Sequence, residues 1–307
     1  MVQILELSRP AACKPLEEWG TVAVELLGTQ TRIVQGKDFY HRVIEVGSGD
    51  PLILIHGVGG HAETYARNLH NLGKHFHVYA IDALYHGFSS KEPYVEDERT
   101  AMQADALADL VRALGYSWAH VEGESMGGAI TWEFGMRHPE MCGKLIMNTG
   151  GPRVSTAGVQ IKENPGGGSA LQELSQRSIL ELNFETMRER MRWLVAKPER
   201  MTDEMVSIRL RIYSFPDIYE SIKKVYRIGS TWTPSRPPLE VSELQSFKPE
   251  SLVFWSEHNP GQGPDYGRFL ADNIPNAKFY NMLDAAHWPQ WEKPEEHDQV
   301  LIDFIKG

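Results

Sequence analysis

A Gly-x-Ser-x-Gly pattern at residues 123–127 joins a short apolar-leaning run to an apolar stretch with helical spacing. A chain that turns this sharply from strand to helix forces one residue into a strained conformation, and small residues on both sides relieve the clashes. Gly123 and Gly127 are those residues. The turn would expose the Ser125 hydroxyl and leave the Met126 backbone N–H at a helix N-terminus, facing any negative charge that forms there. We therefore predict that Ser125 is a nucleophile.

A serine hydroxyl needs an imidazole to take its proton, because it is a weak nucleophile near neutral pH. The chain has twelve histidines, and His287 is the best placed of them because it follows the last apolar run with strand character. In a doubly wound sheet, the loops after the strands lie at the carboxyl edge, where the serine turn also lies. We predict that His287 is the general base.

The glycine-rich segment 56–60 follows the first buried apolar run. Glycines allow backbone N–H groups to approach a substrate oxygen, so we expect the Val58 and Met126 amides to form an oxyanion hole. A phosphate-binding loop is excluded, because no Gly-Lys-Ser/Thr follows and the chain has no dinucleotide fingerprint. His75 and His77 lie close together, but no carboxylate–histidine set has the spacing of metal ligands on a helix. We expect neither a metal nor a cofactor.

The elements that must position these residues alternate along the chain. A helix is predicted at 100–114, where leucine and valine recur at helical spacing and a glycine follows. Strands are predicted where β-branched or continuous apolar runs stand between turn residues. The predicted strands are 21–27, 31–34, 39–46, 52–55, 78–81, 144–147, 252–255 and 278–282. This alternation predicts an α/β fold with a mostly parallel, doubly wound sheet.

The strand pattern stops in residues 150–238, which contain helical stretches instead. One of these stretches has an apolar face made of Met187, Met191, Leu194 and Val195. A helix-rich block inserted between sheet strands is a candidate lid over a site. The expected organisation is an N-terminal arm at 1–20, a core at 21–149 and 239–307, and a helical lid at 150–238.

Composition narrows the range of partners. The net charge of -10 argues against nucleic acid, because phosphate neutralisation needs a basic face. Two cysteines, Cys13 and Cys142, imply no disulfide framework and favour a reducing compartment. The N-terminal residues lack the apolar segment of a signal peptide, and no apolar run approaches membrane-spanning length. We expect a cytoplasmic protein that binds neither nucleic acid nor membrane.

These motifs together resemble the α/β-hydrolase fold and, within it, the meta-cleavage product hydrolases. The resemblance runs roughly from residue 44 to the C-terminus and is carried by segment 123–128, by Arg67-Asn68 and by segment 287–292. Members of that family are serine-dependent enzymes that hydrolyse a C–C bond in ring-fission products of aromatic catabolism. The resemblance implies a small anionic substrate of the 2-hydroxy-6-oxohexa-2,4-dienoate type and a homo-oligomeric protein.

The same resemblance implies residues that contact the substrate. Segment 202–209 is similar to the one that carries the family's carboxylate-binding arginine, which gives that role to Arg209, with Arg211 as the alternative. The family often has asparagine where Glu124 stands. The implied substrate contacts are Arg209, Trp288, Asn68, Gly57 and Glu124.

The sequence departs from the family at the residue that orients the histidine. The family places Asp a few residues after the strand at 252–255, and Asn259 occupies that position here. An amide cannot offset the charge of an imidazolium and can favour the wrong tautomer. In a serine protease, replacing the triad Asp by Asn lowers the rate by about 10⁴. Either another carboxylate substitutes, or a neutral orienting residue suffices, or turnover is inefficient. The candidate substitutes are Asp265, Glu257 and Asp284.

Two other functions fit the same residues. An esterase or lactonase would use the same serine site, because the serine turn does not separate C–O from C–C cleavage. A ligand receptor on a hydrolase scaffold would have lost catalysis at Asn259. The apolar residues of the helical block suit an aryl or alkyl substituent on C6 of a dienoate. C–C hydrolysis is the leading hypothesis.

Overall fold

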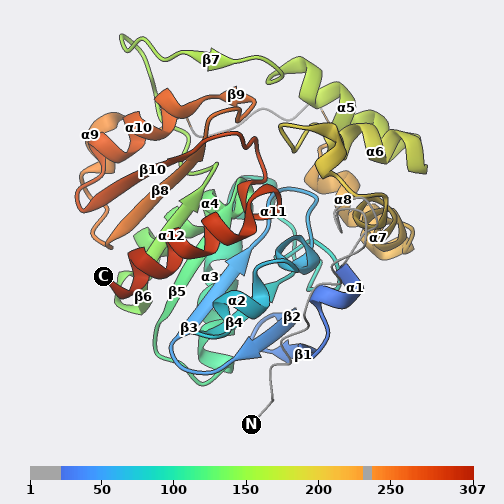
Figure 1. Ribbon diagram of the computed structural model, residues 1–307, viewed down its shortest axis with the longest axis horizontal. Helices are drawn as coiled ribbons and strands as arrows, with labels where there is room; N and C mark the ends of the chain where they lie inside the picture. Colours follow the sequence, from blue (N-terminus) through green and yellow to red (C-terminus); the bar gives the residue numbers. More distant parts are fainter. Residues whose placement is uncertain (1–21, 231–236) are drawn as a thin grey trace, which may run out of the picture.

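The computed structural model describes residues 22–230 and 237–307, which form a central sheet with helices on both faces and a group of helices at one side (Figure 1). The expected arm at 1–20 and Cys13 lie outside the described residues.

An eight-stranded sheet organises the molecule, with strand order β1-β2-β4-β3-β5-β6-β8-β10. Strand β2 runs antiparallel to β1 and to β4, and the other neighbouring strands are parallel. The strands are β1 (Gln30–Gln35), β2 (Tyr40–Gly47), β3 (Pro51–Ile55), β4 (His77–Ile81), β5 (Ala119–Glu124), β6 (Cys142–Asn148), β8 (Ser251–Ser256) and β10 (Ala277–Met282). The predicted α/β fold with a mostly parallel sheet is therefore confirmed.

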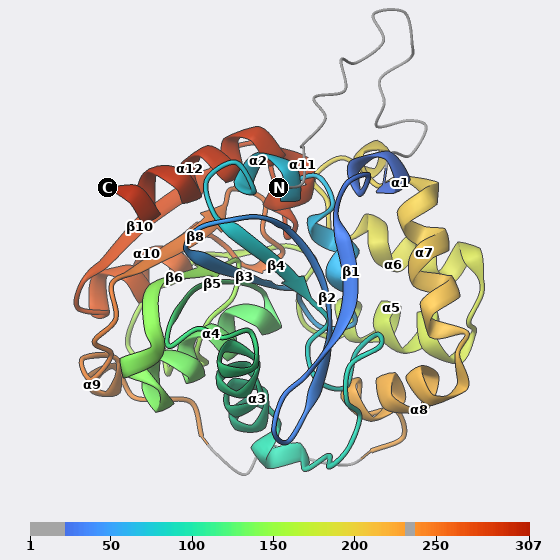
Figure 2. The ribbon, with the colours of Figure 1, turned by 90° about the horizontal axis from the view of Figure 1, so that it is seen from below.

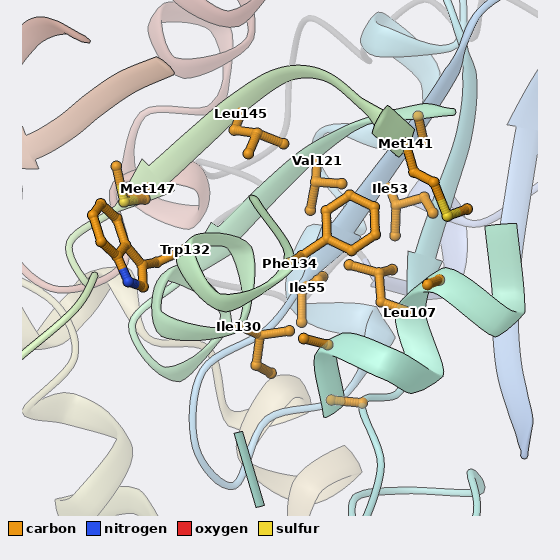
Figure 3. Close-up of a cluster of buried hydrophobic side chains, with 14 of the residues drawn as sticks. Ile53, Ile55, Leu107, Val121, Ile130, Trp132, Phe134, Met141, Leu145 and Met147 are labelled. Atoms are coloured by element: carbon orange, nitrogen blue, oxygen red, sulfur yellow. The ribbon is translucent and has the colours of Figure 1, made fainter. Parts of the chain in front are cut away.

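Both faces of the sheet are covered, as its continuous apolar strands require. Leu52 and Leu54 of β3 pack into one core cluster, and Ile53 and Ile55 into another, because successive side chains of a strand point to opposite faces. Figure 2 shows α3 and α4 on one face and α2 and α12 on the other, and Figure 3 shows the cluster beneath α3 and α4. The helices that cover the sheet are α2 (Leu69–Leu72), α3 (Arg99–Ala113), α4 (Met126–Arg137), α10 (Pro264–Asn273) and α12 (Pro294–Lys306).

The strand predicted at 21–27 is wrong, because this segment begins with the short helix α1 (Val22–Glu25). The backbone N–H of Val22 donates to Glu204 at 2.8 Å, and Val22 packs into the core cluster of the helical block. A carboxylate that accepts from the free N–H groups of a first turn stabilises a helix, and this tertiary contact outweighs the strand preference of valine.

The helical block contains α5 (Ser169–Leu180), α6 (Phe184–Arg192), α7 (Asp203–Tyr213) and α8 (Pro216–Val225). These helices lie together at one side of the sheet (Figures 1 and 2). The apolar residues predicted on one helical face are buried in a core cluster that also includes Trp288 and Trp291 from the sheet domain. A two-residue strand, β7 (Glu163–Asn164), pairs with β9 (Gly261–Gln262) and ties the start of the block to the loop after β8. The short helices α9 (Val241–Leu244) and α11 (Pro289–Glu292) follow the block in the chain.

Candidate active site

Ser125 lies between β5 and α4 with φ 54° and ψ −110°, a backbone conformation that ordinary residues avoid. The two glycines make this turn possible. A Cβ on Gly123 would lie 2.0 Å from the Gly127 carbonyl oxygen, and a Cβ on Gly127 would lie 2.3 Å from that of Ile55. The strained strand-to-helix turn predicted from the sequence is therefore present, and it holds Ser125 at the carboxyl end of the sheet.

His287 lies in the loop between β10 and α11, and its ring is oriented by Asn259. The Nδ1 atom lies 2.7 Å from Asn259 Oδ1, and the Asn259 amide nitrogen donates to the Gln262 carbonyl at 2.6 Å. Because a carbonyl can only accept, Asn259 must turn its own oxygen toward His287, and Nδ1 must carry the proton. Nε2 is then unprotonated in the neutral ring, which is the tautomer that a general base requires.

The three carboxylates considered as substitutes for the missing acid are engaged elsewhere. Asp265 accepts from the Lys162 backbone N–H at 3.3 Å, and Asp284 forms an ion pair with Lys197 at 2.9 Å. Glu257 accepts from the Asp284 backbone N–H at 3.0 Å. Since Asn259 already accepts from His287 Nδ1, the geometry places a neutral amide, and none of these carboxylates, at the orienting position.

The electrostatic surroundings keep His287 neutral. Burial, followed by the positive charge of Arg190, lowers the pKa of His287 to about 3. The Thr149 hydroxyl donates to the His287 carbonyl at 2.9 Å, which fixes the loop. A neutral imidazole whose Nε2 carries no proton can act as a general base.

Glu124 is buried next to this histidine. Its Oε1 lies 3.2 Å from His287 Nε2, and its Oε2 accepts from the Gly57 backbone N–H at 2.7 Å. Burial raises the pKa of Glu124 to about 8. Gly57 and Glu124, both predicted to contact substrate, thus contact each other, and Glu124 faces the nitrogen of His287 that would act as the base.

The loop after β3 is held by tyrosines of the helical block. Tyr213 donates to the Gly59 carbonyl at 2.9 Å, and Tyr226 donates to the Val58 carbonyl at 3.1 Å. Among the described residues, no group accepts from the backbone N–H of Val58 or of Met126. The two amides predicted to bind an oxyanion are therefore available for that purpose, and contacts from α7 and α8 fix one of them.

Arg209 and Trp288, which are both predicted to contact substrate, contact each other. The Arg209 side chain is 2% exposed, and its Cζ lies 5.0 Å from the centre of the Trp288 ring. Its Nε and Nη2 atoms have no hydrogen-bond partner among the described residues. The alternative, Arg211, is exposed and packs its guanidinium over Phe215. A buried guanidinium with unpaired N–H groups is suited to an anionic ligand.

The sequence analysis missed Arg190, which lies on α6 and is 4% exposed. Its Nε donates to the Ser175 hydroxyl at 2.9 Å, and its Nη1 has no partner within the described ranges. Its guanidinium lies over the ring of Trp193, which contacts His287. Arg190 stands three residues after Met187 on the predicted apolar face, so a charge on that face was the available signal.

The Asn68 side chain bonds to the C-terminal part of the fold. Its amide nitrogen donates to the Gln290 carbonyl at 3.1 Å and to Asp298 Oδ1 at 2.8 Å, while its side-chain oxygen has no hydrogen-bond partner among the described residues. The expected contact of Asn68 with substrate stays a prediction. Asp298 is next to His297, whose Nε2 lies 2.9 Å from Glu122 on the serine strand. Burial opposes protonation of His297, but Glu122 and Asp298 outweigh it and raise the pKa to about 9. This charged cluster ties α12 to β5.

Residues 50–294 match the family model described as alpha/beta hydrolase fold. The chain therefore belongs to the α/β-hydrolase fold family, which confirms the fold class expected from the sequence.

Curated relatives narrow the comparison to the meta-cleavage product hydrolases. The chain is 29% identical over 284 residues to the 2-hydroxy-6-oxo-6-phenylhexa-2,4-dienoate hydrolase of Comamonas testosteroni, covering 88% of this chain and 92% of the relative. It is also 29% identical over 275 residues to the 2-hydroxy-6-oxononadienedioate/2-hydroxy-6-oxononatrienedioate hydrolase of Paraburkholderia phymatum, covering 85% and 89%. These relatives confirm the family resemblance read from the sequence.

A solved structure agrees at the level of the fold. The 2-hydroxy-6-oxo-6-phenylhexa-2,4-dienoate hydrolase from Rhodococcus sp. strain RHA1 aligns with a TM-score of 0.74 and 19% identity, covering 91% of this chain and 100% of that one. Within residues 22–230 and 237–307, none of the helices combines the length and apolar character needed to cross a bilayer.

Proposed function

We propose that this protein is a serine-dependent hydrolase that cleaves the C5–C6 bond of a 2-hydroxy-6-oxohexa-2,4-dienoate. The observation that carries the proposal is the state of His287. Its Nδ1 proton is held by Asn259 at 2.7 Å and its pKa lies far below neutrality, so Nε2 is a base at working pH. The curated relatives named above support the choice of substrate class.

The proposed reaction begins at the dienol. Ketonisation moves a proton to C5 and creates an electron sink next to the C6 ketone. Ser125 then adds to C6: its O–H bond breaks, Nε2 of His287 takes the proton, and the carbonyl oxygen takes the negative charge. The backbone N–H groups of Val58 and Met126 would stabilise that oxyanion. Cleavage of C5–C6 leaves its electron pair on the dienolate, which takes the proton from His287 and departs as a 2-hydroxydienoate. Water then gives a proton to His287 and attacks the acyl carbon, and the acid leaves as Ser125 Oγ takes that proton back.

Arg209 is the proposed anchor of the substrate carboxylate. The energetic cost of burying a guanidinium without a partner is large, and a carboxylate that accepts two N–H groups removes it. Its Nε and Nη2 atoms lack partners among the described residues, while the ring of Trp288 holds the guanidinium on one side. These features support binding of the carboxylate and 2-oxo end of the substrate at this residue.

We propose that residues 150–238 act as a lid over a core formed by 21–149 and 239–307. The support is the pair of tyrosine contacts, because Tyr213 and Tyr226 belong to or border helices of the block and bond to the oxyanion loop. Movement of the block would therefore move Val58, and catalysis would depend on closure.

We also propose a cytoplasmic homo-oligomer, on the strength of the family resemblance and the low cysteine content. Light scattering after size-exclusion chromatography tests the assembly; a monomer at micromolar concentration would contradict it.

The function is tested with a yellow 6-phenyl dienoate, a 6-carboxyalkyl dienoate and a p-nitrophenyl ester. We expect loss of the visible absorbance of at least one dienoate, with formation of equal amounts of a 2-hydroxydienoate and an acid, and abolition in Ser125→Ala. Hydrolysis of the ester without turnover of either dienoate would replace the proposal with an esterase. Tight binding of a dienoate without turnover would indicate a receptor.

A further inference from the structure

The two departures from the family pattern meet on one imidazole ring. Asn259 stands where the family has a carboxylate, and Glu124 stands where the family often has asparagine. The Asn259 side-chain oxygen lies 2.7 Å from Nδ1 of His287, and a Glu124 oxygen lies 3.2 Å from Nε2. The carboxylate lost at one end of the ring is matched by a carboxylate gained at the other end.

We propose that Glu124 supplies the negative charge that stabilises the imidazolium of His287, in place of the carboxylate absent at residue 259. This inference rests on the proposed serine mechanism. When Ser125 gives up its hydroxyl proton, Nε2 acquires an N–H bond within hydrogen-bonding distance of Glu124 Oε1, and the Oγ electron pair forms the bond to C6. The imidazolium and the carboxylate then form a neutral pair, while Asn259 keeps the ring oriented.

The position of Glu124 is fixed for this role. Its second oxygen accepts from the Gly57 backbone N–H, so only Oε1 remains for His287. A Cβ on Gly57 would lie 2.4 Å from a carboxylate oxygen of Glu124, so only glycine lets the backbone at residue 57 come this close to the carboxylate. A buried carboxylate with one oxygen free of other hydrogen bonds is costly unless it serves a neighbouring positive charge.

Burial disfavours the ionised form of Glu124 in the resting state, and the imidazolium that forms on His287 during the reaction favours it. Burial, with a smaller contribution from the carboxylate of Glu122, raises the pKa of Glu124 to about 8, although the Gly57 N–H and the guanidiniums of Arg209 and Arg190 lower it. Below that pH the Glu124–His287 pair carries one proton in the resting state, and above it the pair is free to accept the proton of Ser125. The charged and titratable groups that face Glu124 are Glu122, Arg190, Arg209, His287 and Tyr65.

The test removes the Glu124 charge and then moves a carboxylate back to residue 259. Glu124→Gln removes the charge but keeps an oxygen for the Gly57 N–H, and we expect the rate to fall about 10⁴-fold, comparable to loss of a triad carboxylate. Glu124→Asn combined with Asn259→Asp restores the family arrangement, and we expect it to recover activity to within about tenfold of the natural protein. The rising limb of its pH–rate profile then moves from near pH 8 toward the range of an ordinary histidine.

Two readouts separate this inference from the proposed function. The rate at which a p-nitrophenyl phosphate triester labels Ser125 needs no dienoate, with Ser125→Ala as the unreactive control. The pH dependence of this labelling needs no dienoate either, and we expect its rising limb near pH 8 to disappear in Glu124→Gln and to remain in Glu122→Gln. Glu122 is a matched control because it is a buried carboxylate of the same strand that bonds to His297.

An unchanged labelling rate in Glu124→Gln, with the rising limb still near pH 8, would overturn the inference. So would a loss of labelling that the double variant does not recover, since Glu124 would then only hold the Gly57 loop. Normal labelling in the natural protein with no dienoate turnover would leave Glu124 in its role and refute the proposed C–C hydrolysis.

Discussion

Replacement of Arg209 by methionine should weaken catalysis and strengthen the fold. The guanidinium is buried, and two of its nitrogens have no partner among the described residues. Each charge-assisted hydrogen bond to a substrate carboxylate contributes about 1.5–3 kcal/mol, so the loss of two corresponds to about 3–6 kcal/mol. We therefore expect kcat/KM to fall by about 10²- to 10⁴-fold toward a dienoate.

The effect on stability has the opposite sign. Replacing buried ion pairs by apolar side chains of similar volume is often stabilising, by about 1–4 kcal/mol, because it removes their desolvation cost. A buried guanidinium without a hydrogen-bond partner carries the same kind of cost, so we expect a gain in this range. The contact of Arg209 with the Trp288 ring offsets about 1 kcal/mol of this gain. The expected net result is a modest rise in the free energy of unfolding, measured by urea denaturation.

Arg211→Met is the matched control, because Arg211 lies on the same helix but is exposed. We expect no change in kcat/KM beyond about twofold and little change in stability. Equal losses in both variants, or an Arg209→Met protein that is less stable and fully active, would refute the reasoning.

Three further predictions follow from the same site. Tyr213→Phe and Tyr226→Phe each remove a hydrogen bond to the oxyanion loop, so kcat should fall about tenfold for esters and dienoates alike. An unchanged kcat in both variants would contradict the view that these tyrosines fix the loop. The raised pKa of Glu124 favours its neutral form, so the fold keeps its full stability at low pH and loses stability as the pH rises from 4.5 through about 8. Urea denaturation at pH 9 should therefore show Glu124→Gln to be more stable than the natural protein by up to about 5 kcal/mol. At pH 4 the two proteins should be equally stable. Arg190→Met removes a cation that lowers the pKa of both Glu124 and His287, so the rising limb of the pH–rate profile should move to higher pH. A limb that does not move would place Arg190 outside the site.

The serine turn could be predicted because steric crowding at the turn requires glycine on both sides of Ser125. Only glycine fits at residues 123 and 127 once the chain turns from β5 into α4, and the clash distances of the structure express the same constraint. The alternation of apolar runs predicted the sheet for a similar reason, since strands buried on both faces need apolar side chains on both. In contrast, residues 22–25 form a helix because of a carboxylate supplied by Glu204, far away in the sequence.

The orientation of Asn259 could not be predicted, because it depends on the Gln262 carbonyl that fixes its amide. The contact of Glu124 with His287 was equally hidden, since it joins residues from two different strand ends. Arg190 carried a signal, a charge within an apolar helical face, but its burial depends on how α6 packs over the site. The hydrogen bond from the Asn68 amide to Asp298 could not be predicted either, because it joins residues that are far apart in the sequence.

Double-mutant kinetics on residues 125 and 287 test the central claim most directly. If the Ser125 hydroxyl and the His287 imidazole act as one unit, Ser125→Ala, His287→Ala and the double variant should lose activity toward the dienoate to about the same extent. Losses that multiply in the double variant would show that the two side chains act independently and would contradict the account.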